Sequence, residues 1–427
     1  MFNRVQPYAW GSTAMLAAIQ RRQPAGGPEA ELWMGTHPQA PSDIETTSDS
    51  RVSLLDFCAA HPETLGSRAR SLQAPGEDVP GLPFLFKILA VERGLSIQAH
   101  PDRRQAEEGF AREDELAIPR NSPIRTYRDP NHKPEMVCAL TDFWGLCRFR
   151  LRDELVEELS SFRDVLRDVV HGIHQGSEEE PLRAFTKTLD AFLEYPGTES
   201  WRMCFVSLLQ ARDDDHAAGV LVEALATYAR KLAEPRNRYW WVQQLLQQYP
   251  DDVGAFAPLY LNLVHLRPGK AMFLSSGLLH AYLHGAAVEI MANSDNVLRS
   301  GCTIKHVDTE ELARQVQFES GPAPIITDVE RGGLRAYPTS AEEFELFHLD
   351  APATIHKQEG PAIVLNVGDP VTCGEIPLGP GQSLFVEAET DRWQVLSGTE
   401  VARDSTPHRT GEVSLYIAAL PGTISAH

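Results

Sequence analysis

The sequence lacks the features of a disulfide-bonded or membrane-spanning protein. Its six cysteines are scattered over 427 residues without a CxxC pair, so neither a disulfide framework nor a thiolate zinc site is expected. No apolar run approaches the length of a membrane span, and the N-terminus lacks the basic start and apolar stretch of a signal peptide. We therefore expect a cytoplasmic protein.

Positive charge is also scarce. The 39 lysines and arginines face 59 aspartates and glutamates, which leaves a formal net charge of −20. Such a chain repels nucleic acid and anionic lipid, so neither is expected as a partner. An anionic small molecule would need a local basic pocket. The apolar fraction of 42% is enough for a large core, and the length suggests two or three domains.

Two hydrophobic patterns divide the chain. Residues 1–150 mix short β-rich runs with Gly and Pro turns, and the run 82–91 is typical of a buried strand. In residues 151–256 apolar side chains recur every three or four positions, which predicts about five helices. We therefore expect a mainly β protein in which this helical domain interrupts a sheet domain made of residues 1–150 and 257–320. Short apolar runs in residues 321–427 favour a second, C-terminal β domain.

Three segments carry side chains that could bind a metal ion. In the first, an extended conformation would put Gln98 and His100 on one face. The second places Glu135 at the start of a short apolar run. The third offers, on one strand face, His280, Tyr282 and His284. Two imidazoles, a carboxylate and an amide oxygen suit a divalent ion of the zinc type with open positions for water or substrate.

A phosphate dianion in this acidic chain would need hydroxyl and ammonium groups, and the candidates are Ser96, Lys87 and Lys305. Lys87 is the most informative because it stands inside the apolar run 82–91. An unpaired ammonium would be costly to bury there. The side chain therefore either reaches a cleft or snorkels out from an edge strand.

Six ordered blocks resemble the type I mannose-6-phosphate isomerases. They are residues 8–12, 31–38, 82–87, 96–102, 127–136 and 293–301, all in the first two-thirds of the chain. The resemblance implies a cupin-type β-barrel or jelly-roll core, an inserted α-helical domain and a second C-terminal β-barrel domain. It also implies reversible isomerisation of mannose 6-phosphate to fructose 6-phosphate, by metal-assisted proton transfer through an enediolate. The expected partner is a small sugar phosphate, and the expected assembly is a monomer or a weak homo-oligomer.

The resemblance also implies the site residues. In proteins that this chain resembles, one zinc ion per chain is held by residues that match Gln98, His100, Glu135 and His280. Arg299 and Lys133 are placed in the active site, where Arg299 would act as an electrostatic clamp because a guanidinium stays protonated. Lys133 could exchange protons only if it is desolvated beside the metal. Asp295 is the rival base, and the residues alone leave that choice open.

Other residues of the resembling blocks have weaker assignments. Glu289, Tyr282 and His284 are expected to line the same cavity, whereas the blocks that contain Tyr8 and Trp33 are assigned to packing. Ile304 stands where the family commonly has proline, which leaves open the path of the loop that carries Lys305.

Two other functions fit part of the pattern. Two histidines and a carboxylate also bind the iron of non-haem oxygenases, and a non-catalytic sugar-phosphate sensor could use the same fold. Lys133, Arg299 and the fourth ligand position at Gln98 argue against both. The native metal, the acceptance of other hexose phosphates and the direction of the reaction in the cell stay open.

Overall fold

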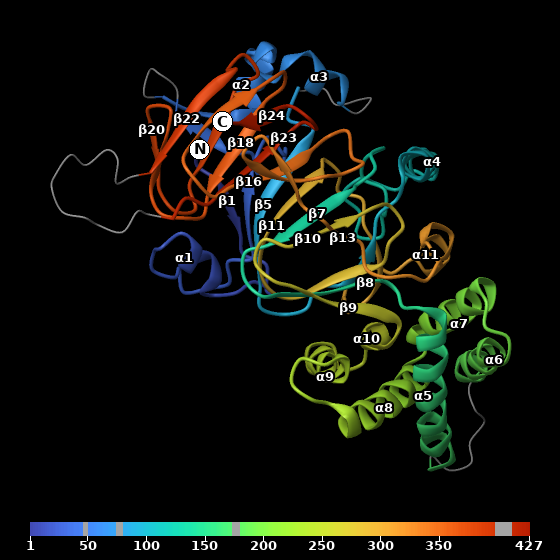
Figure 1. Cartoon of the computed structure of the whole chain (residues 1–427). Coiled ribbons are helices and arrows are strands. Elements are labelled where there is room, and N and C mark those ends of the chain that lie inside the picture. Colours follow the sequence, from blue (N-terminus) through green and yellow to red (C-terminus); the bar gives the residue numbers. More distant parts are fainter. Residues whose placement is uncertain (46–49, 74–79, 173–179, 398–411) are drawn as a thin grey trace.

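The computed structural model describes residues 1–45, 50–73, 80–172, 180–397 and 412–427, and it consists mainly of β-sheets with helices around them (Figure 1). This confirms the expected class at the level of sheet with helices. Among the described residues, no helix is both long and apolar enough to cross a membrane. The six cysteines are all buried and free, as their spacing predicts.

The largest sheet contains eleven strands and carries the candidate site. Its main path runs in the order β1 (Arg4–Gln6), β2 (Glu31–Met34), β5 (Phe84–Val91), β11 (His280–Ala292), β7 (Glu135–Ala139), β10 (Ala271–Leu274) and β13 (Ile325–Ile326). The strands off this path are β6 (Ile97–Ala99), β8 (Phe143–Phe149), β9 (Leu261–Leu266) and β12 (Leu298–Gly301). Every residue of β5 is buried, which confirms the buried strand predicted in residues 82–91.

Strand β11 is the centre of this sheet because its two halves pair with different neighbours. The half after Gly285 pairs with β5 and β7, whereas the half that begins at His280 pairs with β6 and β8. A bulge lies between Tyr282 and His284, and Gly285 has φ +115°, a conformation that side chains rarely adopt. The strand therefore changes direction here and joins two parts of the sheet.

The five helices predicted between residues 151 and 250 are present, and each buries apolar side chains. They are α5 (Arg152–Gly172), α6 (Glu180–Glu194), α7 (Thr198–Gln210), α8 (Asp215–Leu232) and α9 (Arg238–Gln248). Their apolar faces share one core with Leu146 of β8 and Ile97 of β6, so the helical region packs on one end of the large sheet (Figure 1).

Two further sheets form the C-terminal region. One has six strands in the order β14 (Val329–Arg331), β15 (Leu334–Tyr337), β16 (Glu345–Leu349), β23 (Leu415–Ala419), β18 (Ala362–Asn366) and β21 (Ser383–Val386). The other has five strands in the order β20 (Ile376–Leu378), β19 (Val371–Cys373), β22 (Arg392–Ser397), β17 (Ala353–Lys357) and β24 (Ile424–Ala426). The short apolar runs of residues 321–427 therefore form β-strands as predicted, among them β18, β21 and β23.

Strand β18 shows how this region is attached to the large sheet. Ala362 and Val364 pack into the core between the two C-terminal sheets, whereas Ile363 and Leu365 pack into a core shared with Phe84 and other residues of β5. Because successive side chains point to opposite faces, a strand covered on both faces is apolar throughout. The C-terminal region is therefore packed directly on the sheet that carries the site.

The remaining elements connect these layers. They are the helices α1 (Met15–Ile19), α2 (Leu54–Ala60), α3 (Gly66–Ser71), α4 (Arg103–Glu115), α10 (Ala257–Tyr260) and α11 (Thr309–Gln315), and the hairpin strands β3 (Asp43–Glu45) and β4 (Arg51–Ser53). Helix α4 begins with a capping box in which the Asp102 side chain accepts from Gln105 N and the Gln105 side chain accepts from Asp102 N. This cap, at Asp102, fixes the start of α4 three residues after His100.

Candidate metal centre and active site

Three buried side chains converge where β6, β7 and β11 meet. His100 directly follows β6, Glu135 begins β7 and His280 begins β11, and their ligating atoms lie within 4.8 Å of one another. His100 Nε2 is 3.2 Å from Glu135 Oε1, and His280 Nε2 is 3.5 Å from Glu135 Oε2. Segments that are 35 and 145 residues apart in the sequence are thus brought to one point, as the metal-site prediction requires.

Gln98 adjoins this group. It pairs with His280 in the β6–β11 ladder, and its amide nitrogen lies 3.4 Å from His280 Nε2. The two ends of an amide side chain are nearly identical in shape, so a half-turn of the amide would present its oxygen instead. The fourth predicted ligand is therefore within reach of the same centre.

The surroundings of the two histidines fix which nitrogen faces the centre. His100 Nδ1 lies 2.8 Å from the Asn296 carbonyl oxygen, and His280 Nδ1 lies 2.9 Å from the Leu278 carbonyl oxygen. A carbonyl can only accept, so each Nδ1 carries the proton and each Nε2 has a free lone pair. His100 Nε2 and Glu135 Oε2 are buried and have no hydrogen-bond partner among the described residues.

The protonation states also suit a metal. Burial lowers the pKa of His100 to about 4, which outweighs the opposing effect of Glu135. Burial would raise the pKa of Glu135, but His100 and Lys133 hold it well below its ordinary value. Neutral imidazoles and an ionised carboxylate are the forms that bind zinc. Buried atoms without partners, in these forms, fit a divalent cation.

A cavity of about 510 Å³ opens beside this centre. Gln98 and Glu135 contribute to its lining. So do all eight residues that were predicted to act in catalysis or substrate binding: Lys87, Ser96, Lys133, Tyr282, Glu289, Asp295, Arg299 and Lys305. These residues therefore line a single cavity, and its volume is that of a small-molecule site.

Lys87 is a buried, paired lysine on a central strand. Its Nζ donates to Glu289 Oε2 at 3.1 Å and lies 3.6 Å from Glu31 Oε2. Burial alone would lower the pKa of Lys87, but Glu31 and Glu289 raise it above its usual value. The Tyr282 hydroxyl donates to the other oxygen of Glu289 at 3.0 Å. The alternative of a snorkelling edge-strand lysine is wrong, because β5 lies between β2 and β11.

Three cations gather in another part of the wall. Burial lowers the pKa of Arg299 and of Lys305, and the charge of Arg128 lowers both further. Arg299 also lowers the pKa of Lys305. None of the three forms an ion pair with a carboxylate in the part of the chain that the structure describes. The sequence analysis gave no role to Arg128, although it lies inside the resembling block 127–136.

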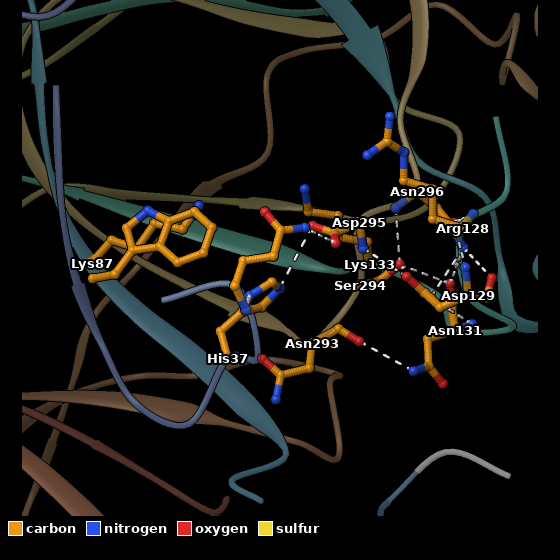
Figure 2. Close-up of polar contacts among 12 residues, drawn as sticks. His37, Lys87, Arg128, Asp129, Asn131, Lys133, Asn293, Ser294, Asp295 and Asn296 are labelled. Carbon is orange, nitrogen blue, oxygen red and sulfur yellow. Dashed lines mark hydrogen bonds and ion pairs between the residues drawn. The ribbon is translucent and has the colours of Figure 1, made fainter. Parts of the chain in front are cut away.

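Lys133 and Asp295 line the same cavity but have different partners. Lys133 Nζ is 3.4 Å from Glu135 Oε1, so it neighbours a proposed ligand. Asp295 Oδ2 accepts from Gln39 Nε2 at 2.6 Å, and Asp295 Oδ1 lies 3.6 Å from His37 Nε2 (Figure 2). Although burial raises the pKa of Asp295, His37 and then Lys133 lower it below its ordinary value.

The cavity lining adds to one sequence assignment and corrects another. Trp33 packs in a small buried cluster with Leu85 and Met291, as assigned, but Trp33 and Tyr8 also line the cavity. His284 is not among the described lining residues, because the bulge after Tyr282 ends the simple alternation along β11.

The sequence analysis also missed His37 and Gln39. His37 belongs to the resembling block 31–38 and Gln39 lies just after it, but no spacing rule connects a turn after β2 with residue 295. The resemblance therefore marked this segment as important but assigned no role to His37.

The chain resembles known proteins over nearly its whole length. Residues 1–152 match the family described as phosphomannose isomerase type I, catalytic domain. Mannose-6-phosphate isomerase of Escherichia coli (strain K12) is 36% identical over 413 residues, which cover 94% of this chain and 98% of that protein. The human mannose-6-phosphate isomerase is 31% identical, with 90% and 92% covered.

Solved structures give the same result. A zinc-bound holo structure of mannose 6-phosphate isomerase has a TM-score of 0.82 and 32% identity, and 98% of each chain is covered. A variant of phosphomannose isomerase from Salmonella typhimurium has a TM-score of 0.83 at the same identity and coverage. Such coverage includes the C-terminal region, where the sequence alone showed only a general likeness.

Proposed function

The chain belongs to the type I phosphomannose isomerase family, and we propose on that premise how its own residues carry out the reaction. The reaction is the reversible isomerisation of mannose 6-phosphate to fructose 6-phosphate, with zinc as the cofactor. The oxygenase and sensor alternatives are set aside because relatives that cover most of the chain are isomerases. The observation that carries the proposal is the buried His100, Glu135 and His280 group beside a cavity lined by cations.

Gln98, His100, Glu135 and His280 would hold the zinc ion. When bound, the ion supplies Lewis-acid polarisation of the carbonyl and hydroxyl oxygens at the reacting carbons. One carboxylate among four ligands leaves such a centre electropositive, which favours an oxyanion. The carbonyl partners of His100 and His280 keep both rings in the orientation and tautomer that this role needs.

The cations Arg128, Arg299 and Lys305 support a phosphate subsite. Arg128 lowers the pKa of Arg299, and both lower that of Lys305, so these neighbouring positive charges favour a dianion; Ser96 adds a hydroxyl to the lining of the same cavity. Arg299 pairs with Gln98 in the β12–β6 ladder, so the two side chains leave the ladder on the same face and Arg299 starts beside a proposed metal ligand. We assign it to the charge that develops on the reacting oxygens.

We do not assign Lys87 to the phosphate subsite. Two carboxylates already neutralise it, so it adds little charge for a dianion. Lys87, Glu289 and Tyr282 form one hydrogen-bonded row that offers donors and acceptors to sugar hydroxyls. This row would orient the open-chain sugar with respect to the metal centre.

Asp295 is our choice for the proton acceptor. Its lowered pKa keeps it ionised near neutrality, whereas Lys133 Nζ lies 3.4 Å from the carboxylate of Glu135, a proposed zinc ligand. In the forward direction Asp295 would take the proton from C2 and return it to C1, while the hydroxyl proton moves from O2 to O1. Lys133 and Arg299 would stabilise the enediolate between these two transfers.

The finer architecture and setting belong to the same proposal. We assign a cupin-type barrel to residues 1–150 and 257–320, a helical domain to residues 151–256 and a C-terminal β-barrel domain to residues 321–427. The separate sheets and the run of helices support these limits. We also propose a cytoplasmic enzyme that is a monomer or a weak homo-oligomer.

The deciding experiment is conversion of mannose 6-phosphate to fructose 6-phosphate by the purified chain, before and after chelation. Turnover that disappears with the metal and returns with zinc would support the reaction and the centre together. Absence of turnover in protein shown by mass spectrometry to hold one zinc ion would overturn the proposal.

A further inference from the structure

The carboxylate of Asp295 is held from two sides by a turn that lies 256 residues earlier in the chain. Gln39 Nε2 donates to Oδ2 at 2.6 Å, and His37 Nε2 faces Oδ1 at 3.6 Å (Figure 2). His37, Gln39 and Asp295 all line the cavity that contains Gln98 and Glu135. The turn after β2 therefore reaches a side chain that we assign to proton transfer.

The ring of His37 has a fixed orientation. It is only 5% exposed, and it packs edge-on against Trp33 with 4.8 Å between ring centroids. The backbone N–H of Gln39 donates to His37 Nδ1 at 3.4 Å. With Nδ1 as the acceptor, the neutral ring carries its proton on Nε2, the nitrogen that faces Asp295. The distance of 3.6 Å closes to a hydrogen bond with a small rotation.

The backbone of Asp295 is held by different groups. Its N–H donates to Asp129 Oδ2 at 2.7 Å. The Asp129 carboxylate also accepts from Ser294 Oγ, Asn131 N and Asn296 Nδ2. Removal of His37 or Gln39 should therefore change the side chain of Asp295 and leave its backbone in place.

The charged and titratable groups near Asp295 come from several elements. His37, Lys133 and Arg128 favour its ionised form, against the effect of burial. Burial raises the pKa of the Asp129 carboxyl and of the Tyr8 hydroxyl, and the nearby Asp295 charge adds to the rise in each. Among the groups that lower the pKa of Asp295, His37 has the largest effect.

We propose that His37, assisted by Gln39, is a positioning residue that directs the ionised carboxylate of Asp295 toward the sugar. This inference rests on the proposed function, in which Asp295 accepts the proton from C2. The Nε2–H of His37 donates to one carboxylate oxygen and keeps its own proton throughout. Gln39 donates to the other oxygen. The two contacts together keep the Asp295 side chain in a single rotamer at the cavity wall.

The test compares variants of the zinc-loaded, full-length enzyme. In His37→Phe the ring keeps its shape but loses the donor, and we expect kcat to fall by about 10 to 100-fold with KM changed less than about threefold. Gln39→Leu, at an exposed position, should have a smaller effect of the same kind. His37→Gln restores an N–H donor and should recover part of the rate. His61→Phe, at an exposed histidine, is the matched control and should equal wild type.

The pH profile separates this role from a packing role. Activity needs ionised Asp295 and is lost as the pH falls through its pKa. Loss of the His37 donor raises that pKa, so the acid limb of kcat/KM should move to higher pH in His37→Phe and back in His37→Gln. An unmoved acid limb in a slow, zinc-loaded His37→Phe enzyme would contradict the proposal.

A double variant separates the two levels of inference. In an Asp295→Asn background, His37→Phe should cause almost no further loss, because the two residues act as a unit. Multiplication of the two losses would show that His37 acts independently and would overturn the positioning role. A nearly wild-type rate for Asp295→Asn would instead overturn the proton-transfer role that the proposed function gives to Asp295, and a slow Asp295→Asn with a fast His37→Phe would overturn only this inference.

Discussion

Two buried lysines show how differently the two β regions treat charge. Lys87 in the large sheet meets the carboxylates of Glu289 and Glu31. Lys357, at the end of β17 in the C-terminal region, donates to the carbonyl oxygens of Gly360 at 2.7 Å and Ala388 at 2.9 Å. Burial lowers the pKa of Lys357 to about 8, whereas carboxylates raise the pKa of Lys87 above its ordinary value.

The contrast indicates where the chemistry is. Buried ions of both signs cluster in the large sheet, around the cavity that Lys87 and Glu135 share. Between the C-terminal sheets the core is apolar, and Lys357 is satisfied by backbone alone. Buried ion pairs seldom add net stability over an apolar core, so a cluster of them points to a function.

The largest expected effect is at His280, and His348 offers a buried histidine of the other region for comparison. His280→Ala should lose zinc and reduce kcat by more than about 1000-fold, because the ion supplies the main electrophile. His348 lies in β16, where Nε2 is 3.0 Å from Ser414 Oγ, so His348→Ala should keep zinc and rate. Zinc content by mass spectrometry and steady-state rates of both variants test this comparison. Full activity in zinc-free His280→Ala would break the comparison.

Arg299 should show the next largest effect. Arg299→Ala should keep its zinc but lose about 100 to 1000-fold in kcat, because it removes charge aimed at the reacting oxygens. Arg331 in the C-terminal region pairs with Glu345 at 2.8 Å, and Arg331→Ala should leave turnover unchanged. The same assays apply. A wild-type rate for Arg299→Ala would remove it from the mechanism.

The two lysines themselves should differ in their effect on stability. Lys87→Met leaves Glu289 and Glu31 buried without their cation, which should lower the free energy of unfolding by about 3 kcal/mol. Lys357→Met loses two hydrogen bonds to carbonyls but also removes a disfavoured buried charge. Its net effect should stay within about 1 kcal/mol. Urea unfolding measures the free energy of unfolding of both variants. Equal decreases would contradict the expected difference between Lys87 and Lys357.

Local patterns were enough to predict the elements of the fold. The period of three or four residues found the helices α5 to α9, and the run in residues 82–91 found β5. The same run could not show that β5 is a central strand. That depends on pairing with β2 and β11, and β11 lies almost 200 residues away. The partners of Lys87 were unpredictable for the same reason.

The candidate site divides in the same way. The metal-binding residue types were visible in short segments, and the resemblance completed the set. The roles of His37 and Arg128 depend on long-range contacts to Asp295 and Arg299, which no local spacing encodes. The prediction that His284 lines the cavity was wrong for a local reason. It assumed regular alternation along β11, and the bulge beside Gly285 breaks that alternation.

The smallest expected effect is the pH dependence that Lys357 gives to stability. Its pKa of about 8 lies below the ordinary 10.5, so between these values the unfolded chain binds more protons than the folded chain. Its contribution to stability therefore rises with pH across this window. Lys87, whose pKa is raised, has the opposite sign, and its contribution is lost only above the ordinary lysine pKa.

The measurement for Lys357 is thermal unfolding of wild type and Lys357→Met at pH 7.5 and 9.5. Wild type should gain about 1 to 2 °C in Tm relative to the variant at the higher pH, which for a chain of this size corresponds to about 1 kcal/mol. Lys87→Met should show no such change over the same interval, because Lys87 is protonated in both states there. If the Tm difference from wild type changed equally with pH for both variants, the pKa values of Lys357 and Lys87 would not be shifted in opposite directions, and the contrast between the two lysines would be wrong.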